Sequence, residues 1–190
     1  LASSAGADLA NYSISANTLN DFVVDQKAVT YSIAAGNITY GDAHSAGAIS
    51  YTGLETDDVV TATAQIDDVS LSTANKLEAG TYTQSIDGTH GGADVANYSI
   101  TLDTANNYVV DQKAITYDIA SGNVTYGDNL SETPGAVSFT GVETDDVVTG
   151  TAQIDDTATS TAGYLQAGTY TQSLASSAGA DLANYSISAN

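Results

Sequence analysis

The sequence contains no cysteine, methionine, tryptophan or arginine, and its 190 residues carry three basic side chains, all lysines, against 23 acidic ones. The formal net charge of −20 repels phosphate backbones and anionic lipid headgroups. Nucleic acids and anionic membrane surfaces are therefore not expected as partners. Without cysteine the chain forms no disulfide bond, and this absence leaves the cellular compartment open because cytosolic proteins can also lack cysteine.

Long apolar runs are also missing. No stretch approaches the ~20 apolar residues that a membrane-spanning helix needs, so no membrane insertion of this segment is expected. No signal peptide is present at the start, and the first residue is Leu1, which suggests a window from a longer polypeptide. The hydrophobic fraction of 42%, with abundant Val, Ile, Thr and Tyr, nevertheless predicts a folded chain.

What the sequence does contain is internal repetition. The word VVDQKA begins at residues 23 and 109, ETDDVVT at 55 and 143, and AGTYTQS at 79 and 167. The opening word LASSAGADLANYSISAN, which begins at residue 1, returns at residue 174. A fixed period of about 86 residues predicts a tandem array of equal units. We place the joints near residues 22 and 108. Residues 1–22 are then the C-terminal part of a preceding repeat, 23–108 the first full repeat and 109–190 the second.

Short segments in which apolar and polar residues alternate predict half-buried strands. Residues 27–34 place Val29, Tyr31 and Ile33 on one face, and turn residues separate this segment from the next. About seven such strands per repeat predict an all-β fold, with each repeat an immunoglobulin-like antiparallel β-sandwich of about 86 residues. A parallel sheet is not expected because there is no room for crossover helices. A β-helix would need an internal period near 20–25 residues, which is not seen.

The order of the repeated words is similar to a known family. Each repeat has a VDQKAxTY opening, a Tyr-Gly-Asp turn, a Gly-Leu/Val-x-x-Asp-Asp-Val step, an Ala-Gly-Thr-Tyr word and an Ala-Asn-Tyr-Ser-Ile close. This order resembles the tandem MBG/YDG-type repeats of large secreted bacterial adhesins related to filamentous haemagglutinin, over essentially all of both repeats. The resemblance implies small all-β units in the stalk of a secreted or surface-anchored adhesin, and it brings no catalytic residues.

Paired acidic residues are the candidates for a metal site. Calcium prefers six to eight oxygen ligands, and four aspartate pairs could offer some of them: Asp57 and Asp58, Asp67 and Asp68, Asp145 and Asp146, and Asp155 and Asp156. The spacing of a calcium-binding loop is absent. The favoured interpretation is that these acids occupy turns and keep strand edges from pairing with neighbouring chains. No other cofactor is expected.

Other reactive groups have ordinary interpretations. A cross-link between Lys27 or Lys113 and a nearby asparagine is conceivable, although a lysine paired with an acid is the more common outcome. The repeated tyrosines are predicted to be core residues whose hydroxyls reach a partner. His44 and His90 have no counterparts in the other copy, so no catalytic triad can be built and no enzyme is predicted.

These observations predict a structural stalk or fibre repeat of an extracellular or cell-surface bacterial adhesin or matrix filament, which spaces and stiffens the chain for attachment or biofilm cohesion. The expected partners are neighbouring repeats of the same chain, and like fibres or surface carbohydrate in addition. In one version the closing strand of one repeat completes the sheet of the next. The alternative is a repeated weak carbohydrate- or calcium-binding module that acts through avidity.

Overall fold

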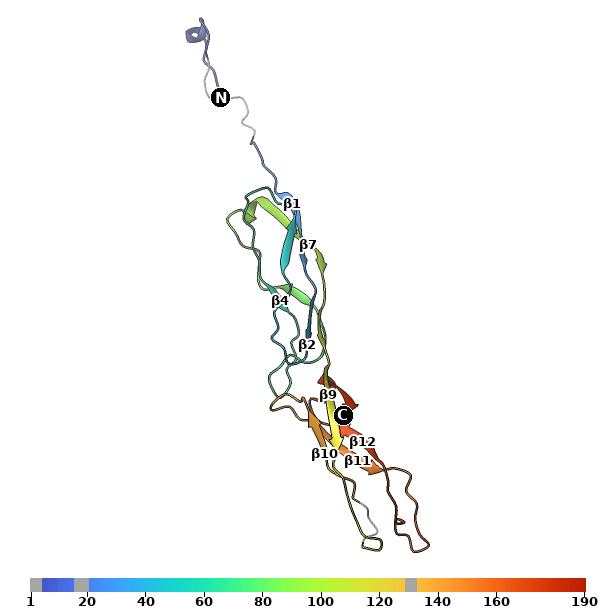
Figure 1. Cartoon of the computed structure of the whole chain (residues 1–190). Coiled ribbons are helices and arrows are strands. Elements are labelled where there is room, and N and C mark those ends of the chain that lie inside the picture. The colour runs from blue at the N-terminus through green and yellow to red at the C-terminus, as the bar shows by residue number, and fades with distance from the viewer. Residues whose placement is uncertain (1–4, 16–20, 129–132) are drawn as a thin grey trace.

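The computed structural model describes residues 5–15, 21–128 and 133–190, which form an elongated, rod-shaped molecule (Figure 1). Its regular structure consists of thirteen strands and three short 3-10 turns, and the described residues contain no α-helix. In that part of the chain no helix has the length and apolar character needed to cross a membrane. The predicted all-β class is confirmed at this level: strands in several small sheets.

The three 3-10 turns show how local sequence sets local structure. They are η1 (Leu9–Asn11), η2 (Val95–Asn97) and η3 (Leu182–Asn184). In each, an aspartate with φ between −102° and −108° precedes the turn, and a tyrosine in extended conformation follows it. The turn η1 keeps this geometry although Tyr12 after it is 72% exposed. The Asp-x-Ala-Asn-Tyr word therefore carries its own backbone conformation.

The upper part of the first repeat is one mixed sheet. Strands β1 (Lys27–Ile33), β3 (Ile49–Thr52) and β7 (Tyr98–Ala105) lie in the order β3-β1-β7. Strand β1 pairs antiparallel with β3 and parallel with β7. The predicted alternation along β1 is confirmed, because Val29 and Ile33 are 2% and 0% exposed.

The expectation of purely antiparallel pairing is wrong at three places. Strand β1 runs parallel to β7, and two further parallel pairs occur lower in the rod. A parallel pair needs a long connection, and the prediction assumed that this connection would have to be a helix. Here most of a repeat, with its own strands, connects β1 to β7, so no crossover helix is needed.

The lower part of the first repeat holds a second sheet and a strand pair. Strands β2 (Gly36–Thr39), β5 (Gly80–Tyr82) and β8 (Tyr108–Asp111) lie in the order β2-β8-β5, while β4 (Ala64–Ile66) pairs with β6 (Gln84–Ile86). Strand β8 is central: it runs parallel to β2 and antiparallel to β5. It also spans the boundary predicted between residues 108 and 109, and residues 109–111 pair with the sheet of the first repeat.

The second repeat has the same upper sheet and a different lower part. Strands β9 (Lys113–Ile119), β10 (Val137–Thr140) and β13 (Tyr185–Ala189) lie in the order β10-β9-β13, and β11 (Thr149–Ile154) pairs with β12 (Gln172–Ala178). Residues 122–125 and 168–170 correspond in sequence to β2 and β5, but they form no strands. The strand that would lie between them is not supplied by the described residues of this repeat.

Two clusters of buried side chains form the core. One lies in the upper first repeat and centres on Val29, Val60 and Tyr98. The larger one takes residues from both repeats: Tyr40, Leu77, Tyr108, Val110, Ile115 and Tyr185. A hydrophobic core that crosses a repeat boundary couples the two repeats energetically, as nearest-neighbour contacts do in other repeat proteins.

Candidate functional site: the joint between the repeats

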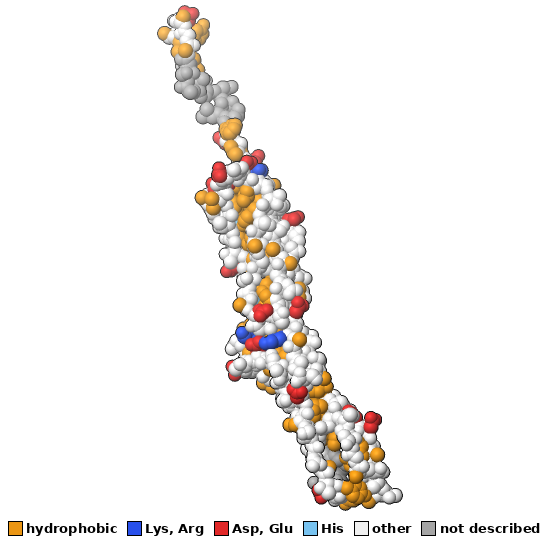
Figure 2. Space-filling view, viewed as in Figure 1, with side chains coloured by type: hydrophobic (Ala, Val, Ile, Leu, Met, Phe, Trp, Pro, Cys, Tyr) orange, Lys and Arg blue, Asp and Glu red, His pale blue; other side chains and the backbone are white. Residues whose placement is uncertain are grey.

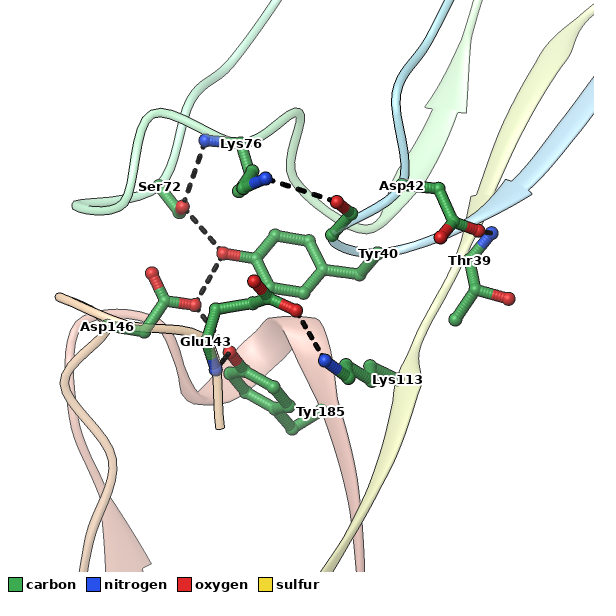
Figure 3. Close-up of polar contacts among 10 residues, drawn as sticks. Thr39, Tyr40, Asp42, Ser72, Lys76, Lys113, Glu143, Asp146 and Tyr185 are labelled. Carbon is green, nitrogen blue, oxygen red and sulfur yellow. Dashed lines mark hydrogen bonds and ion pairs between the residues drawn. The ribbon is translucent and has the colours of Figure 1, made fainter. Parts of the chain in front are cut away.

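The most elaborate polar cluster of the described chain lies where the two repeats meet (Figure 3). We call this contact the joint: residues 39–42, 72–79 and β8 from the first repeat against residues 113–115, 142–148 and 181–185 from the second. These segments come together because β8 leads directly into β9, so one continuous stretch of backbone belongs to a sheet of each repeat.

The aromatic ring of Tyr108 anchors β8 in the first repeat. Its side chain is 2% exposed. It lies against the backbone of Gly36, where a β-carbon would be 2.2 Å from the ring atom Cδ2 of Tyr108. No side chain could occupy that position without displacing the ring, so glycine is required there.

The carboxylate of Asp146 is the hub of the joint. Its Oδ2 accepts hydrogen bonds from the hydroxyls of Tyr40 and Tyr185, each at 2.5 Å, and its Oδ1 accepts from the backbone N–H of Ala74 at 3.1 Å. The hydroxyls of Tyr40 and Ser72 are also hydrogen-bonded at 2.6 Å. The rings of Tyr40 and Tyr185 pack edge to face, with their centroids 5.3 Å apart. One acidic side chain of the second repeat thus holds two groups of the first, and the charge-assisted bonds are of the strong kind.

Asp181 and Asn184 make the second polar contact of the joint. Both side chains are 2% exposed. The carboxylate of Asp181 accepts two hydrogen bonds from Thr73, one from the hydroxyl at 2.5 Å and one from the backbone N–H at 3.0 Å. Asn184 Oδ1 accepts a hydrogen bond from the backbone N–H of Ala79 at 2.8 Å. Burial alone would raise the pKa of Asp181, but the hydrogen bonds from Thr73 and Val147 outweigh it and hold that pKa below its usual value. Buried polar groups of the second repeat are therefore satisfied by the first.

The lysines of the joint add an ion pair and a carbonyl contact. Lys113 Nζ pairs with Glu143, and Lys76 Nζ donates to the carbonyl of Gly41 at 3.2 Å. Glu143 closes over Gly41, where a β-carbon would lie 2.5 Å from its Oε1. Lys113 and Glu143 are only partly exposed, with 32% and 23% of their side-chain surface accessible, so solvent screens this pair less than an exposed one.

The upper end of the first repeat carries the same residues without a repeat against them. Asp58, Asp94 and Asn97 correspond to Asp146, Asp181 and Asn184. Asp58 accepts one side-chain hydrogen bond, from Tyr98, and Asn97 is exposed. Lys27 and Glu55 form the corresponding ion pair at 2.7 Å, but it is exposed. Asp181 and Asn184 are thus buried where the described chain supplies a preceding repeat, whereas their counterparts Asp94 and Asn97 are half-buried and exposed.

The tyrosines of the joint give it a pH dependence. Burial, followed by the hydrogen bond to Asp146, raises the pKa of Tyr40 and of Tyr185 above the usual value near 10. A tyrosine whose pKa is higher in the folded state gives a stabilisation that is complete below pH 10 and is lost as the pH rises further. We therefore expect the thermal midpoint to fall steeply above pH 10.

Melts of the chain and of a Tyr40→Phe/Tyr185→Phe variant between pH 8 and 11 would measure this effect. The variant should show a shallower decline above pH 10. Some slope should remain because Tyr51, Tyr82 and Tyr98 also have raised pKa values, chiefly from burial in the first two and from the Asp58 hydrogen bond in the third. Equal slopes for both proteins would show that the joint tyrosines do not govern the alkaline transition.

The structure places the eight calcium candidates in turns. One aspartate of each pair has a left-handed backbone, namely Asp57, Asp68, Asp145 and Asp156, with φ between 51° and 75°. The remaining aspartates accept hydrogen bonds: Asp58 from Tyr98, Asp67 from Gln65 and Ser85, Asp155 from Gln153 and Ser173, and Asp146 at the joint. Among the described residues no group of three or more acidic, histidine or cysteine side chains is arranged to hold a metal ion.

The lysine–asparagine pairs considered for a cross-link are not brought together. Lys27 and Lys113 contact Glu55 and Glu143, while Asn184 accepts from a backbone N–H. His90 has a local role instead. Its Nδ1 is hydrogen-bonded to the hydroxyl of Tyr51 at 2.8 Å, and the second repeat, which lacks this histidine, has Phe139 in place of Tyr51.

The repeated tyrosines are buried, half-buried or exposed. Four predicted core residues are half-buried, namely Tyr31, Tyr82, Tyr117 and Tyr170. Tyr40, Tyr98 and Tyr185 are at most 5% exposed and their hydroxyls are hydrogen-bonded, as predicted for core residues. Tyr12 and Tyr126 are 72% and 54% exposed. The exposed ones correspond in sequence to the buried ones, so position in the array, rather than residue type, decides their burial.

Comparisons with protein-family models, curated proteins and solved structures give no significant match to this chain. The joint is therefore interpreted from its own geometry. Sequence reasoning did not find it, although a signal was present: the repeated words Tyr-Gly-Asp, Glu-Thr-Asp-Asp and Ala-Asn-Tyr supply residues to it, among them Gly41, Glu143 and Tyr185.

Proposed function

We propose that this chain is a stiff structural segment of an extracellular adhesin or matrix filament, in which each repeat is fixed end to end against the next. The single observation that carries the proposal is strand β8. It pairs with β2 and β5 of the first repeat and continues within two residues into β9 of the second. A flexible linker would leave those backbone groups in water, whereas here they belong to a sheet.

Two features of the joint support stiffness. Its core takes side chains from both repeats. Its polar groups are satisfied across the boundary, chiefly at Asp146 and Asp181. A rotation of one repeat relative to the other would leave buried donors and acceptors unpaired, at a cost of about 1–3 kcal/mol for each such group.

The extracellular setting and the role in attachment rest on the resemblance of the repeated words to adhesin repeats and on the composition. A chain with three lysines and no arginine offers few cleavage sites to trypsin-like proteases. The acidic surface suits a saline medium, where self-repulsion is screened within ~10 Å at 0.1 M salt. The immunoglobulin-like sandwich for each repeat stays a prediction.

Stiffness is directly measurable. Residual dipolar couplings of the two repeats, recorded in a weakly aligning medium, should fit one common alignment tensor because the repeats tumble as one body. The matched variant is Asp146→Ala, which keeps both repeats and removes the carboxylate at the centre of the joint. Its couplings should need a separate alignment tensor for each repeat, or a tensor of reduced magnitude for one of them. Two independent tensors for the unmodified chain would refute the proposal of a stiff rod.

A further inference from the structure

Two distant segments of the first repeat lie side by side and run in the same direction along the rod. Residues 27–39 contain β1 and β2, and residues 98–111 contain β7 and β8. Strand β1 pairs in parallel with β7 over seven residue pairs, and β2 pairs in parallel with β8 over four. We call this pairing the axial ladder, because β1, β2 and β7 follow the long axis of the molecule in Figure 1.

Backbone hydrogen bonds continue the axial ladder across the gap between its two sheets. The N–H of Asn106 donates to the carbonyl of Ile33 at 3.1 Å, and the N–H of Gly36 donates to the carbonyl of Asn107 at 3.3 Å. These four residues join the end of the β1–β7 pair to the start of the β2–β8 pair. The two segments are therefore hydrogen-bonded to each other from one end of the ladder to the other.

The side chain of Gln84 reinforces the ladder at this gap. It is 4% exposed, and its Nε2 donates to the carbonyl of Ala34 in one segment at 3.0 Å and to the carbonyl of Asn106 in the other at 2.6 Å. Its Oε1 accepts a hydrogen bond from the backbone N–H of Gly47 at 2.7 Å. One buried amide thus binds both segments at the point where neither of them forms a strand.

Buried side chains hold the two segments in register. Val29 and Ile33 on one segment, and Tyr108 and Val110 on the other, are at most 3% exposed. Because successive side chains of a strand point to opposite faces, sliding one segment by one residue would move its buried side chains to the solvent face. The ladder therefore resists sliding through the packing of its core as well as through its hydrogen bonds.

The connectivity of the chain determines how a pull along the rod acts on this ladder. Tension from the N-terminal side enters at Lys27, in the first residue pair, and tension from the C-terminal side enters at Asp111, in the last. Because the segments are parallel, these two points lie at opposite ends of the ladder, and tension slides one segment past the other. The evenly spaced hydrogen bonds of a parallel pair then share the force, whereas peeling from one end would load them one after another.

The second repeat continues the same path of force. Strand β8 leads directly into β9, and β9 pairs in parallel with β13 over five residue pairs. The extended stretch of residues 98–117 is thus overlapped by residues 27–39 in the first repeat and by residues 185–189 in the second. Figure 2 shows the two repeats stacked in single file, so a pull on both ends of the rod acts along this stretch.

We propose that the first repeat bears tension along the rod through the axial ladder, and that Gln84 is the positioning residue that keeps the two halves of the ladder together. This function goes beyond the proposed stiffness, because stiffness opposes bending and the ladder opposes stretching. Residues 40–97, which fold between the two segments, carry no tension while the ladder is intact. The repeat therefore keeps its folded length under tension until the ladder breaks, and it then yields in one step.

Single-molecule pulling in two directions tests the proposal on the full chain. The chain contains no cysteine, so introduced cysteines give unique attachment points. An Asp25→Cys/Asp111→Cys variant loads the ladder in shear, and an Asp25→Cys/Asn97→Cys variant peels it from its upper end; the three native side chains are exposed. At equal loading rate the rupture force in shear should be about twofold or more that in peeling, because many hydrogen bonds share the force. Rupture in shear should release about 250 Å of chain in one step.

A Gln84→Ala substitution, added to both cysteine variants, tests the positioning residue. It should lower the rupture force in shear and leave the force at the onset of peeling unchanged, because peeling separates β1 from β7 before it reaches Gln84. Gln172→Ala is the matched control. Gln172 makes similar contacts in the second repeat, with the N–H of Gly135 at 2.6 Å and the carbonyl of Ala120 at 3.2 Å, and it lies outside the loaded residues. Its substitution should change neither force.

Equal rupture forces in shear and in peeling would overturn the proposal, as would gradual lengthening of the repeat under shear. This comparison needs no change at Gln84, so it stands even if Gln84→Ala does not fold. Equal effects of Gln84→Ala and Gln172→Ala on the shear force would remove the role given to Gln84. Failure of the proposed function is a separate result, since the dipolar couplings would still fit one tensor in a stiff chain whose ladder breaks easily.

Discussion

Tyr108→Ala is expected to lower the free energy of unfolding by about 3–5 kcal/mol, the range for large aromatic residues in a core. The side chain is 2% exposed and packs in the cluster that spans both repeats. Its removal leaves a cavity against Gly36 and loosens β8 from β2 and β5. The effect should appear as a lower denaturant midpoint for both repeats, because the shared core couples them.

Phe22→Ala is the matched control for this experiment. Phe22 occupies the same position of the repeat but is 93% exposed, so its substitution should change the stability of the dilute chain by less than about 0.5 kcal/mol. Denaturant titrations followed by circular dichroism, at concentrations where the chain is monomeric, provide the comparison. Equal effects of the two substitutions would mean that β8 is not held in the first repeat.

Asp146→Ala is expected to lower the free energy of unfolding by about 4.5 kcal/mol or more, because three donors lose their acceptor and each hydrogen bond to a charged group contributes about 1.5–3 kcal/mol. The donors are Tyr40, Tyr185 and the N–H of Ala74. Two of these belong to the first repeat, so the loss acts on the contact between repeats as well as on the second repeat itself.

The control here is Asp58→Ala, in the corresponding turn of the first repeat. Asp58 accepts a single side-chain hydrogen bond, from Tyr98 at 2.5 Å, so a loss of about 1.5–3 kcal/mol is expected. The comparison separates the role of the turn, which both aspartates share, from the role of the joint, which only Asp146 has. A loss for Asp58→Ala as large as that for Asp146→Ala would assign the whole effect to the turn.

The strands themselves could be predicted from the sequence to a large extent. Alternation in residues 27–34 gave β1, and the buried positions Val29 and Ile33 are those expected. Alternation indicates which face of a strand is buried, because side chains point to opposite faces in turn. It does not indicate the neighbouring strand. The parallel partner β7 lies some seventy residues away along the chain, and the pairing direction was therefore wrong.

The joint could not be predicted from the words that form it. The letters VVD occur at residues 23–25 and again at 109–111. The first set is exposed, while the second lies in the centre of a sheet. The difference comes from the preceding residues 36–39 and 80–82, which exist for one copy and not for the other among the described residues. A periodic sequence indicates the length of the repeat, but it does not indicate at which residue one structural unit ends and the next begins.

The acidic pairs show a similar limit of reasoning by residue type. The sequence predicted that these aspartates occupy turns, and four of the eight have the left-handed backbone conformation found in turns. The same reasoning treated the pairs Asp57 and Asp58, and Asp145 and Asp146, as equivalent. In the structure Asp146 holds the joint, whereas Asp58 contacts only its own repeat through its side chain.

Amide hydrogen exchange of the two VVD segments tests the shared strand most directly, because the sequences are identical and only their surroundings differ. In the dilute chain, the amides of residues 109–111 should be protected to the same degree as those of β1, while the amides of residues 23–25 should exchange at the rate of an unstructured peptide. Equal and fast exchange at both segments would contradict the account, because the repeats would then be joined by a linker and not by a strand.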